Sequence, residues 1–204
     1  MPELVTRGTG EHEVIADQAE IQVTFSADAA DRSTAVARLG ERMAVVDPLL
    51  ARDGIKERQR TVAVHGQWDN NRRTGSTAQE FLVLRVTDLA GLDDLLAALF
   101  SAEPDWLNGP QWSLVDESAA MREAQRKAVE DARSRARAYA DALGGQLGAL
   151  LRLADDGADR PYPMPMAMAA DGARMGQESV RQLGLTPGTV TVRATCTAVW
   201  SLDR

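Results

Sequence analysis

Cysteine, histidine and lysine are scarce in this chain of 204 residues, and long apolar runs are missing. The one cysteine, Cys196, cannot form a disulfide within the chain, so no disulfide framework supports the fold. No segment has the roughly 20 apolar residues of a membrane-spanning helix, and the N-terminal residues contain no apolar core of export length. We therefore expect a cytoplasmic protein without a membrane partner.

Positive charge is in the minority and is almost entirely arginine. The chain has 30 acidic and 23 basic side chains, a net charge of −7, and only Lys56 and Lys127 as lysines. An acidic balance without a polybasic run disfavours binding to the phosphate backbone of nucleic acids. The 44% of hydrophobic residues is enough for one substantial core or two small ones.

The most regular pattern is an alanine at every fourth position of one segment: Ala120, Ala124, Ala128, Ala132, Ala136 and Ala140. Such a row drifts by about 40° at each step of a helix. Met121, Val129, Tyr139 and Leu143 widen it to an apolar arc of roughly 160°, opposite a face of mixed charge. Gly144 and Gly145 suit the C-terminal end. The pattern predicts a long helix that packs closely, with the larger side chains supplying the bulk that alanine lacks.

Shorter patterns predict an α+β fold with the element order ββαββαβαββ. Helices are expected at about 31–53, after a capping Asp88, and along the alanine row. A polar turn at 69–75 predicts a hairpin. We expect a single domain over 1–204, with helices on one face of a mixed, mainly antiparallel sheet. The predicted strands are 4–14, 19–29, 59–68, 78–87, 106–115, 147–154 and 189–202.

A loop rich in proline and methionine is expected at 155–187. After Tyr162 in the sequence, a methionine stands at every second position, at Met164, Met166 and Met168, in a stretch stiffened by prolines. Methionine fills irregular contacts and proline lowers the ordering cost, so we favour an arm that packs on a neighbouring subunit, with these four residues as interface candidates. Thioethers also bind Cu(I) and are oxidised reversibly. A metal-binding or redox-buffering function with the three methionines is therefore an alternative.

The sequence contains no complete motif for catalysis. His12 and His65 lack the HExxH spacing of zinc peptidases, and the segment 8–10 lacks the third glycine of a dinucleotide fingerprint. No serine stands in a G-x-S-x-G elbow, and the aspartates at 155, 156 and 159 lack the spacing of a calcium loop. We predict no catalytic residue, no cofactor and no resident metal. A hydrolase stays open as a second alternative, which requires His12 or His65 to meet a carboxylate or nucleophile in a pocket.

Several short blocks of the chain match one known family in their order and spacing: Gly8-Thr9-Gly10, Asp17-Gln18-Ala19, Asn108-Gly109, Trp112-Ser113-Leu114, Lys127-Ala128, Asp131-Ala132-Arg133, Leu143-Gly144 and Leu147-Gly148. With these blocks the chain resembles the SIMPL-domain proteins, which are named after a signalling molecule associated with a Pelle-like kinase and include exported immunogenic and oxidative-stress-defence proteins of bacteria. The resemblance implies an α+β fold that forms homo-oligomers and has no established catalytic residues. It favours a non-enzymatic, self-assembling scaffold or adaptor with a role in stress and with room for a protein partner.

Overall fold

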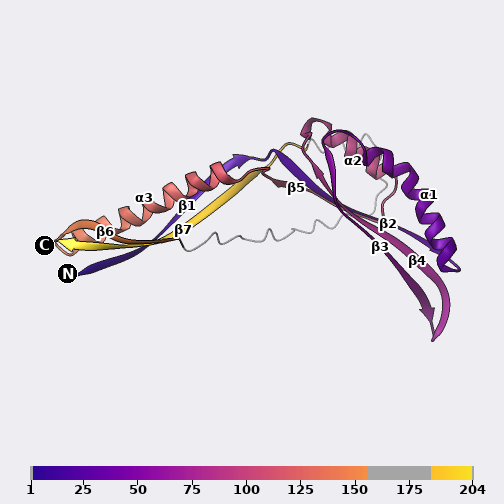
Figure 1. The fold of residues 1–204 in the computed structure, drawn as a ribbon, viewed down its shortest axis with the longest axis horizontal. Helices are drawn as coiled ribbons and strands as arrows, with labels where there is room; N and C mark the ends of the chain where they lie inside the picture. The colour runs from indigo at the N-terminus through magenta and orange to yellow at the C-terminus, as the bar shows by residue number, and fades with distance from the viewer. Residues whose placement is uncertain (1, 156–184, 204) are drawn as a thin grey trace. The chain divides into compact units, whose positions relative to one another are not determined.

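The computed structural model describes residues 2–155 and 185–203, and it divides into two compact units (Figure 1). The described parts of unit 1 are residues 2–15, 115–155 and 189–203, and those of unit 2 are 16–114 and 185–188. Each unit contains one antiparallel sheet and at least one helix. The predicted α+β class is confirmed.

Unit 2 is a four-stranded sheet in the order β3-β4-β2-β5, with two helices against one face. Alternating side chains of β2 and β4 point toward these helices and form the core, which includes Ile21, Val23 and Phe25 together with Leu82 and Leu84. The elements are β2 (Gln18–Ala29), α1 (Arg32–Leu50), β3 (Ile55–Asp69), β4 (Arg72–Val86), the 3-10 turn η1 (Leu89–Gly91), α2 (Leu92–Ser101) and β5 (Trp106–Ser113).

The β3–β4 hairpin was predicted correctly, but its turn is tighter than expected. Asp69 pairs with Arg72, so only Asn70 and Asn71 remain in the turn, with φ angles of +45° and +64°. A two-residue turn in this conformation matches the twist of the strands, and asparagine tolerates positive φ better than most residues. The strands therefore run further than the alternation in the sequence indicates.

Helix α1 starts where the sequence predicts and ends three residues early. The Asp31 carboxylate accepts a hydrogen bond from the Thr34 N–H at 2.9 Å and caps the first turn. Because of this bond, the pKa of Asp31 lies below its ordinary value. The helix ends at Leu50, soon after Pro48. Asp88, expected to cap the next helix, stands before η1 but makes no side-chain capping bond.

Unit 1 is a three-stranded sheet in the order β1-β7-β6 with α3 packed on one face (Figure 1). The first and last strands of the chain pair along their full length, from Glu3 opposite Ser201 to Ile15 opposite Thr189. The elements are β1 (Glu3–Ile15), α3 (Ser118–Ala142), β6 (Gln146–Asp155) and β7 (Thr189–Asp203).

The single mixed sheet expected from the sequence is replaced by two antiparallel sheets. Strands β1 and β2 follow each other in the chain but do not form a hairpin, because β1 pairs with β7 and β2 with β4 and β5. The turn between them bonds elsewhere: Ala16 donates to the Gly188 carbonyl at 2.9 Å and Asp17 donates to the Ser113 carbonyl at 3.3 Å. The consecutive strands β1 and β2 therefore lie in different sheets.

The alanine row of α3 is buried along its whole length, as predicted, and the structure identifies its packing partner as strand β1. The helix lies on the two glycines of β1. A Cβ on Gly8 would overlap the Ala128 carbonyl oxygen and lie 2.8 Å from the Ala132 Cβ, and a Cβ on Gly10 would overlap the Ala124 carbonyl oxygen. Helix and strand backbones are therefore nearly in contact.

The larger apolar residues of α3 were expected on the buried face with the alanines, and this was wrong for two of them. Tyr139 and Leu143 are exposed, while Met121 and Val129 are partly buried. With glycine on the strand, alanine alone fills the space between helix and sheet. Bulkier groups have no room there, and the last turn of α3 presents them to solvent.

Candidate functional site

The residues predicted to form the interface arm or a metal site lie outside the described parts of the chain. This applies to Tyr162, Met164, Met166 and Met168. The arm and the metal-binding alternative therefore stay predictions. Within residues 2–155 and 185–203, no group of three or more histidine, cysteine or acidic residues is arranged to hold a metal ion. Over the same ranges, no helix combines the length and the apolar character needed to cross a membrane.

The two histidines lie on strands of different units. His12 is on β1 opposite Val192. His65 is on β3, and the register places Thr77 of β4 beside it and Asp28 of β2 beyond Thr77. Cys196 is buried on β7 opposite Gly8. His65 thus comes near both a hydroxyl and a carboxylate.

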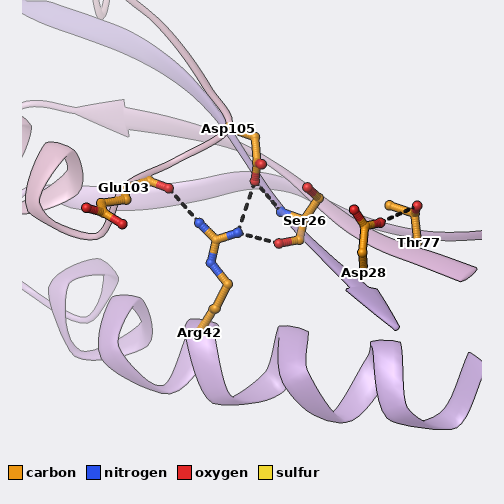
Figure 2. Close-up of polar contacts among 6 residues, drawn as sticks. All are labelled: Ser26, Asp28, Arg42, Thr77, Glu103 and Asp105. Atoms are coloured by element: carbon orange, nitrogen blue, oxygen red, sulfur yellow. Dashed lines mark hydrogen bonds and ion pairs between the residues drawn. The ribbon is translucent and has the colours of Figure 1, made fainter. Parts of the chain in front are cut away.

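Hydrogen bonds connect Thr77 and Asp28 in this row, but they do not involve the imidazole of His65. The Thr77 hydroxyl donates to Asp28 Oδ1 at 2.6 Å (Figure 2), and the Gln67 amide donates to the same oxygen at 2.8 Å. The imidazole of His65 makes no hydrogen bond to any other described residue. A hydroxyl nucleophile activated by histidine has to donate its proton to the imidazole. In this row the proton points to Asp28, so the arrangement joins three strands and does not prepare a nucleophile.

A second polar cluster lies where β5 leaves β2 without a partner. The ladder between β5 and β2 ends at Trp106, the first residue of β5, which pairs with Thr24. Beyond it, no strand of the described chain runs beside the backbone of Ser26 on that side. Asp105 Oδ2 accepts from the Ser26 N–H at 2.5 Å, and the Arg42 guanidinium donates to the Ser26 carbonyl. Two side chains thus replace the missing strand (Figure 2).

Arg42 is the centre of this cluster, which we call the Arg42 clamp (Arg42, Ser26, Glu103 and Asp105). Its guanidinium donates to Asp105 at 3.2 Å and to the Glu103 carbonyl at 2.5 Å, and it lies 5.5 Å from the centre of the Phe25 ring. One helical turn earlier, Arg38 donates to the Asp28 carbonyl at 2.8 Å. Four-residue spacing puts both arginines on one side of α1. The four-residue spacing of the two arginines is visible in the sequence, but the edge of β2 that they protect is known only from the strand pairing.

A buried carboxylate on β4 is linked to the same helix through an arginine of β3. Glu80 of β4 is buried and forms an ion pair with Arg60 of β3, which also bonds Asp47 of α1 at 3.0 Å. Burial alone would lower the pKa of Arg60, but the charges of Glu80 and Asp47 raise it above its ordinary value. Arg60 is thus paired with two carboxylates, and these ion pairs join α1 to β3 and β4.

The outer strands of the two sheets differ in how they protect their edges. Exposed strand edges carry unpaired backbone groups that attract other strands, and charges, proline or shortness prevent such pairing. Strand β3 carries charged residues from Lys56 to Arg58, β1 carries acidic and basic residues along its length, and β5 is only 8 residues long and contains Pro110. These three edges are protected.

Strand β6 has little of this protection. Leu150, Leu151 and Leu153 are 45%, 51% and 48% exposed, and Arg152 is the only charged residue between Gln146 and Ala154. We call these three leucines the β6 leucine edge. The sequence predicted this strand, but its position at the edge of a sheet follows only from the tertiary pairing with β7.

These features place the protein in a class: α+β proteins in which two antiparallel sheets each pack on helices. Comparison with known families makes this specific. The profile of the SIMPL family, described as "Protein of unknown function (DUF541)", matches residues 4–200. The chain belongs to this family.

Other comparisons add little. No curated protein matches the chain. Among solved structures, a Burkholderia cenocepacia protein named as an amidohydrolase/peptidase matches with 20% identity and a TM-score of 0.27, over 50% of this chain and 28% of that one. The chain thus spans less than a third of that protein, and so distant a likeness carries no argument about activity.

Proposed function

We propose that this SIMPL-family protein is a non-enzymatic scaffold or adaptor that works by self-association, and that copies meet at the β6 leucine edge. The observation that supports this is the contrast among the sheet edges. The outer strands β1, β3 and β5 carry charges or proline, whereas β6 exposes leucines along an edge on which no strand of the described residues pairs. Natural proteins avoid such an edge unless something covers it.

A second copy is the partner that fits this edge. Two β6 strands from separate copies can pair antiparallel about a two-fold axis, which extends each three-stranded sheet into one of six strands and uses the same surface on both copies. The backbone groups then gain hydrogen bonds, and the leucines lose exposed apolar area at about 25 cal/mol per Å². Pairing at the edge needs no rearrangement of the core.

Two more exposed apolar residues stand at the end of α3, shortly before β6 in the sequence. Tyr139 on the helix and Leu143 at its C-cap are both exposed, and two glycines separate Leu143 from Gln146. Exposed aromatic and leucine side chains beside a pairing strand would add apolar contacts to the interface. These residues are therefore the second part of the surface we propose.

Light scattering across a concentration series tests the proposal on the full chain and on Leu151→Lys. We expect the full chain to be a multimer and Leu151→Lys to shift it toward the monomer, because a charge on β6 supplies the protection that the other edges have. Val62→Lys is the matched control, since Val62 is an exposed apolar residue on the protected strand β3. A monomeric full chain, or an unchanged mass for Leu151→Lys, would contradict the proposal.

A further inference from the structure

The sheet of unit 2 has a second face, on which none of the described helices lies. Ile21, Val23 and Phe25 of β2 belong to the core beneath α1 and α2. Because side chains alternate along a strand, Thr24 and its neighbours two residues away point to the opposite face. Phe81 and Trp106 are likewise absent from the core cluster, whereas Leu82 and Leu107 pack in it or against it. They therefore share the second face with Thr24.

Two aromatic residues stand on this face in one cross-strand row. Trp106 of β5 is opposite Thr24 of β2, Thr24 is opposite Phe81 of β4, and Phe81 is opposite Thr61 of β3. Two strand spacings separate Trp106 from Phe81, about 10 Å. Trp106 is 46% exposed, whereas Thr24 between the aromatic residues is only 6% exposed. The row is an aromatic platform, partly open to solvent, with a hydroxyl in its middle.

The rows on either side of this platform carry amides and no charge. Toward one end the register aligns Asn108, Gln22, Val83 and Gln59, and toward the other it aligns Ser26, Gln79 and Ala63. Charged residues make up 26% of the chain, yet none occurs at these positions or in the aromatic row.

Charge returns only at the margins of this face. Glu20 and Arg85 face each other beyond one end, and Asp28 lies beyond the other. Asp105 stands at the margin beside Ser26, where its carboxylate is held by Arg42 and the Ser26 N–H. The uncharged region thus spans all the strands of the sheet at its centre.

We propose that this face binds a neutral oligosaccharide in an extended conformation. The apolar face of a sugar ring stacks on an aromatic side chain, and the separation of Trp106 and Phe81 is comparable to a repeat of two sugar rings in an extended chain. Amide side chains offer both donors and acceptors, which match hydroxyl groups. An ionic ligand would find no opposite charge on the platform or in the two rows beside it, and a purely apolar partner would leave the amides buried without hydrogen bonds.

Titration calorimetry on the full chain tests this with cellohexaose, mannohexaose and N-acetylated chitohexaose as neutral probes and hexagalacturonate as the anionic one. We expect at least one neutral hexasaccharide to bind, with Trp106→Ala and Phe81→Ala each weakening it by about tenfold, because each removes a stacking surface. Gln79→Glu changes an exposed amide to a carboxylate with little effect on folding, and we expect it to weaken binding severalfold.

Trp68→Ala is the matched control, because Trp68 is also an exposed tryptophan but lies near the tip of the β3–β4 hairpin. Its affinity for the sugar should equal that of the unmodified chain. The proposal is overturned if no neutral hexasaccharide binds, if the anionic probe binds more tightly, or if Trp68→Ala loses as much affinity as Trp106→Ala. A change of mass in Trp106→Ala without sugar binding in the unmodified chain would assign the face to contacts between copies instead.

Discussion

At the scale of single residues, the two glycines of β1 determine how closely α3 approaches the sheet. The Ala132 carbonyl also accepts a hydrogen bond from the Thr6 hydroxyl at 2.9 Å, and Thr6 in turn accepts one from the Trp200 indole at 3.1 Å. At the end of the seam, Lys127 donates to the Glu11 carbonyl at 2.8 Å. Small residues thus allow the contact, and polar groups on the strand set its position.

Gly8→Ala should destabilise unit 1 by about 2 kcal/mol or more, in the range seen for overpacked cores. The added Cβ would overlap the Ala128 carbonyl oxygen, so helix and strand have to separate. Gly40→Ala is the control, because a Cβ there meets no atom within 4 Å and alanine favours a helix over glycine by up to about 1 kcal/mol. Urea unfolding measures both. Equal stabilities for the two variants would refute the close packing.

Asp131 gives unit 1 a dependence on pH. Its carboxylate accepts from the Thr9 N–H at 3.0 Å and pairs with Arg135 at 3.1 Å, and these bonds lower its pKa from the ordinary value of 3.8. A lowered pKa stabilises the folded state above pH 3.8, and that contribution is lost as the pH falls through the folded-state pKa. Stability from this group is therefore full at neutral pH.

We expect Asp131→Asn to lower the free energy of unfolding at pH 7 by about 0.5 to 1 kcal/mol, because the bond is partly exposed to solvent. The difference from the unmodified chain should shrink below pH 3.8. Asp141→Asn on the same helix controls for the loss of a charge. Unfolding curves at several pH values measure this, and a difference that is constant with pH would contradict the assignment.

At the scale of elements, α1 does two things: it covers the core of unit 2 with one face and closes an edge of β2 with Arg38 and Arg42. Helix and strand are thereby joined by hydrogen bonds as well as by apolar packing. An unpaired strand edge is a route to pairing with other chains. The Arg42 clamp is thus a further way in which this fold protects an edge, besides charges, proline and a short strand.

Arg42→Leu should destabilise unit 2 by about 1 to 2 kcal/mol, because it leaves Asp105 and the carbonyls of Ser26 and Glu103 without their donor. Arg38→Leu, which removes one bond to the Asp28 carbonyl, should cost less. Thermal unfolding compares the two. Hydrogen exchange of the Ser26 amide should also accelerate in Arg42→Leu, since Asp105 loses the group that orients it; unchanged exchange would argue against the clamp.

At the scale of the whole molecule, the chain returns to its start, because β7 completes the sheet that β1 begins. Most of unit 2 is inserted in the sequence between β1 and α3. The first segment of unit 1 ends at Ile15, and its next segment begins about a hundred positions later, at Val115. The family match from 4 to 200 covers both units.

Net charge predicts how salt affects the proposed self-association. Two copies with a charge of −7 each repel, and the β6 leucine edge attracts through apolar burial and backbone pairing. Raising salt screens the repulsion and leaves the apolar contact intact. We expect the dissociation constant from light scattering to decrease as the salt concentration is raised from about 0.05 M to about 0.5 M. Weaker association at high salt would indicate an interface held by ion pairs and contradict pairing at β6.

The sequence by itself determined the class of the fold, the order of its elements and most of their limits. Hydrophobic alternation and the spacing of the alanines are local signals with periods of 2 and 3.6 residues, so they can be read without knowing any partner. The buried row of α3 and the β3–β4 hairpin follow from them. The family resemblance rested on such local blocks too.

The tertiary structure alone decided which strands pair, and with that it decided every candidate surface. Nothing local distinguishes β6 as an edge, shows Gly8 lying beneath Ala128, or places Ser26 beside Arg42 where β5 stops. The aromatic row of Trp106 and Phe81 likewise exists only in the register of strands distant in sequence. Pairing depends on long-range hydrogen bonds and complementary faces, and one chain's periodicity specifies neither partner nor register.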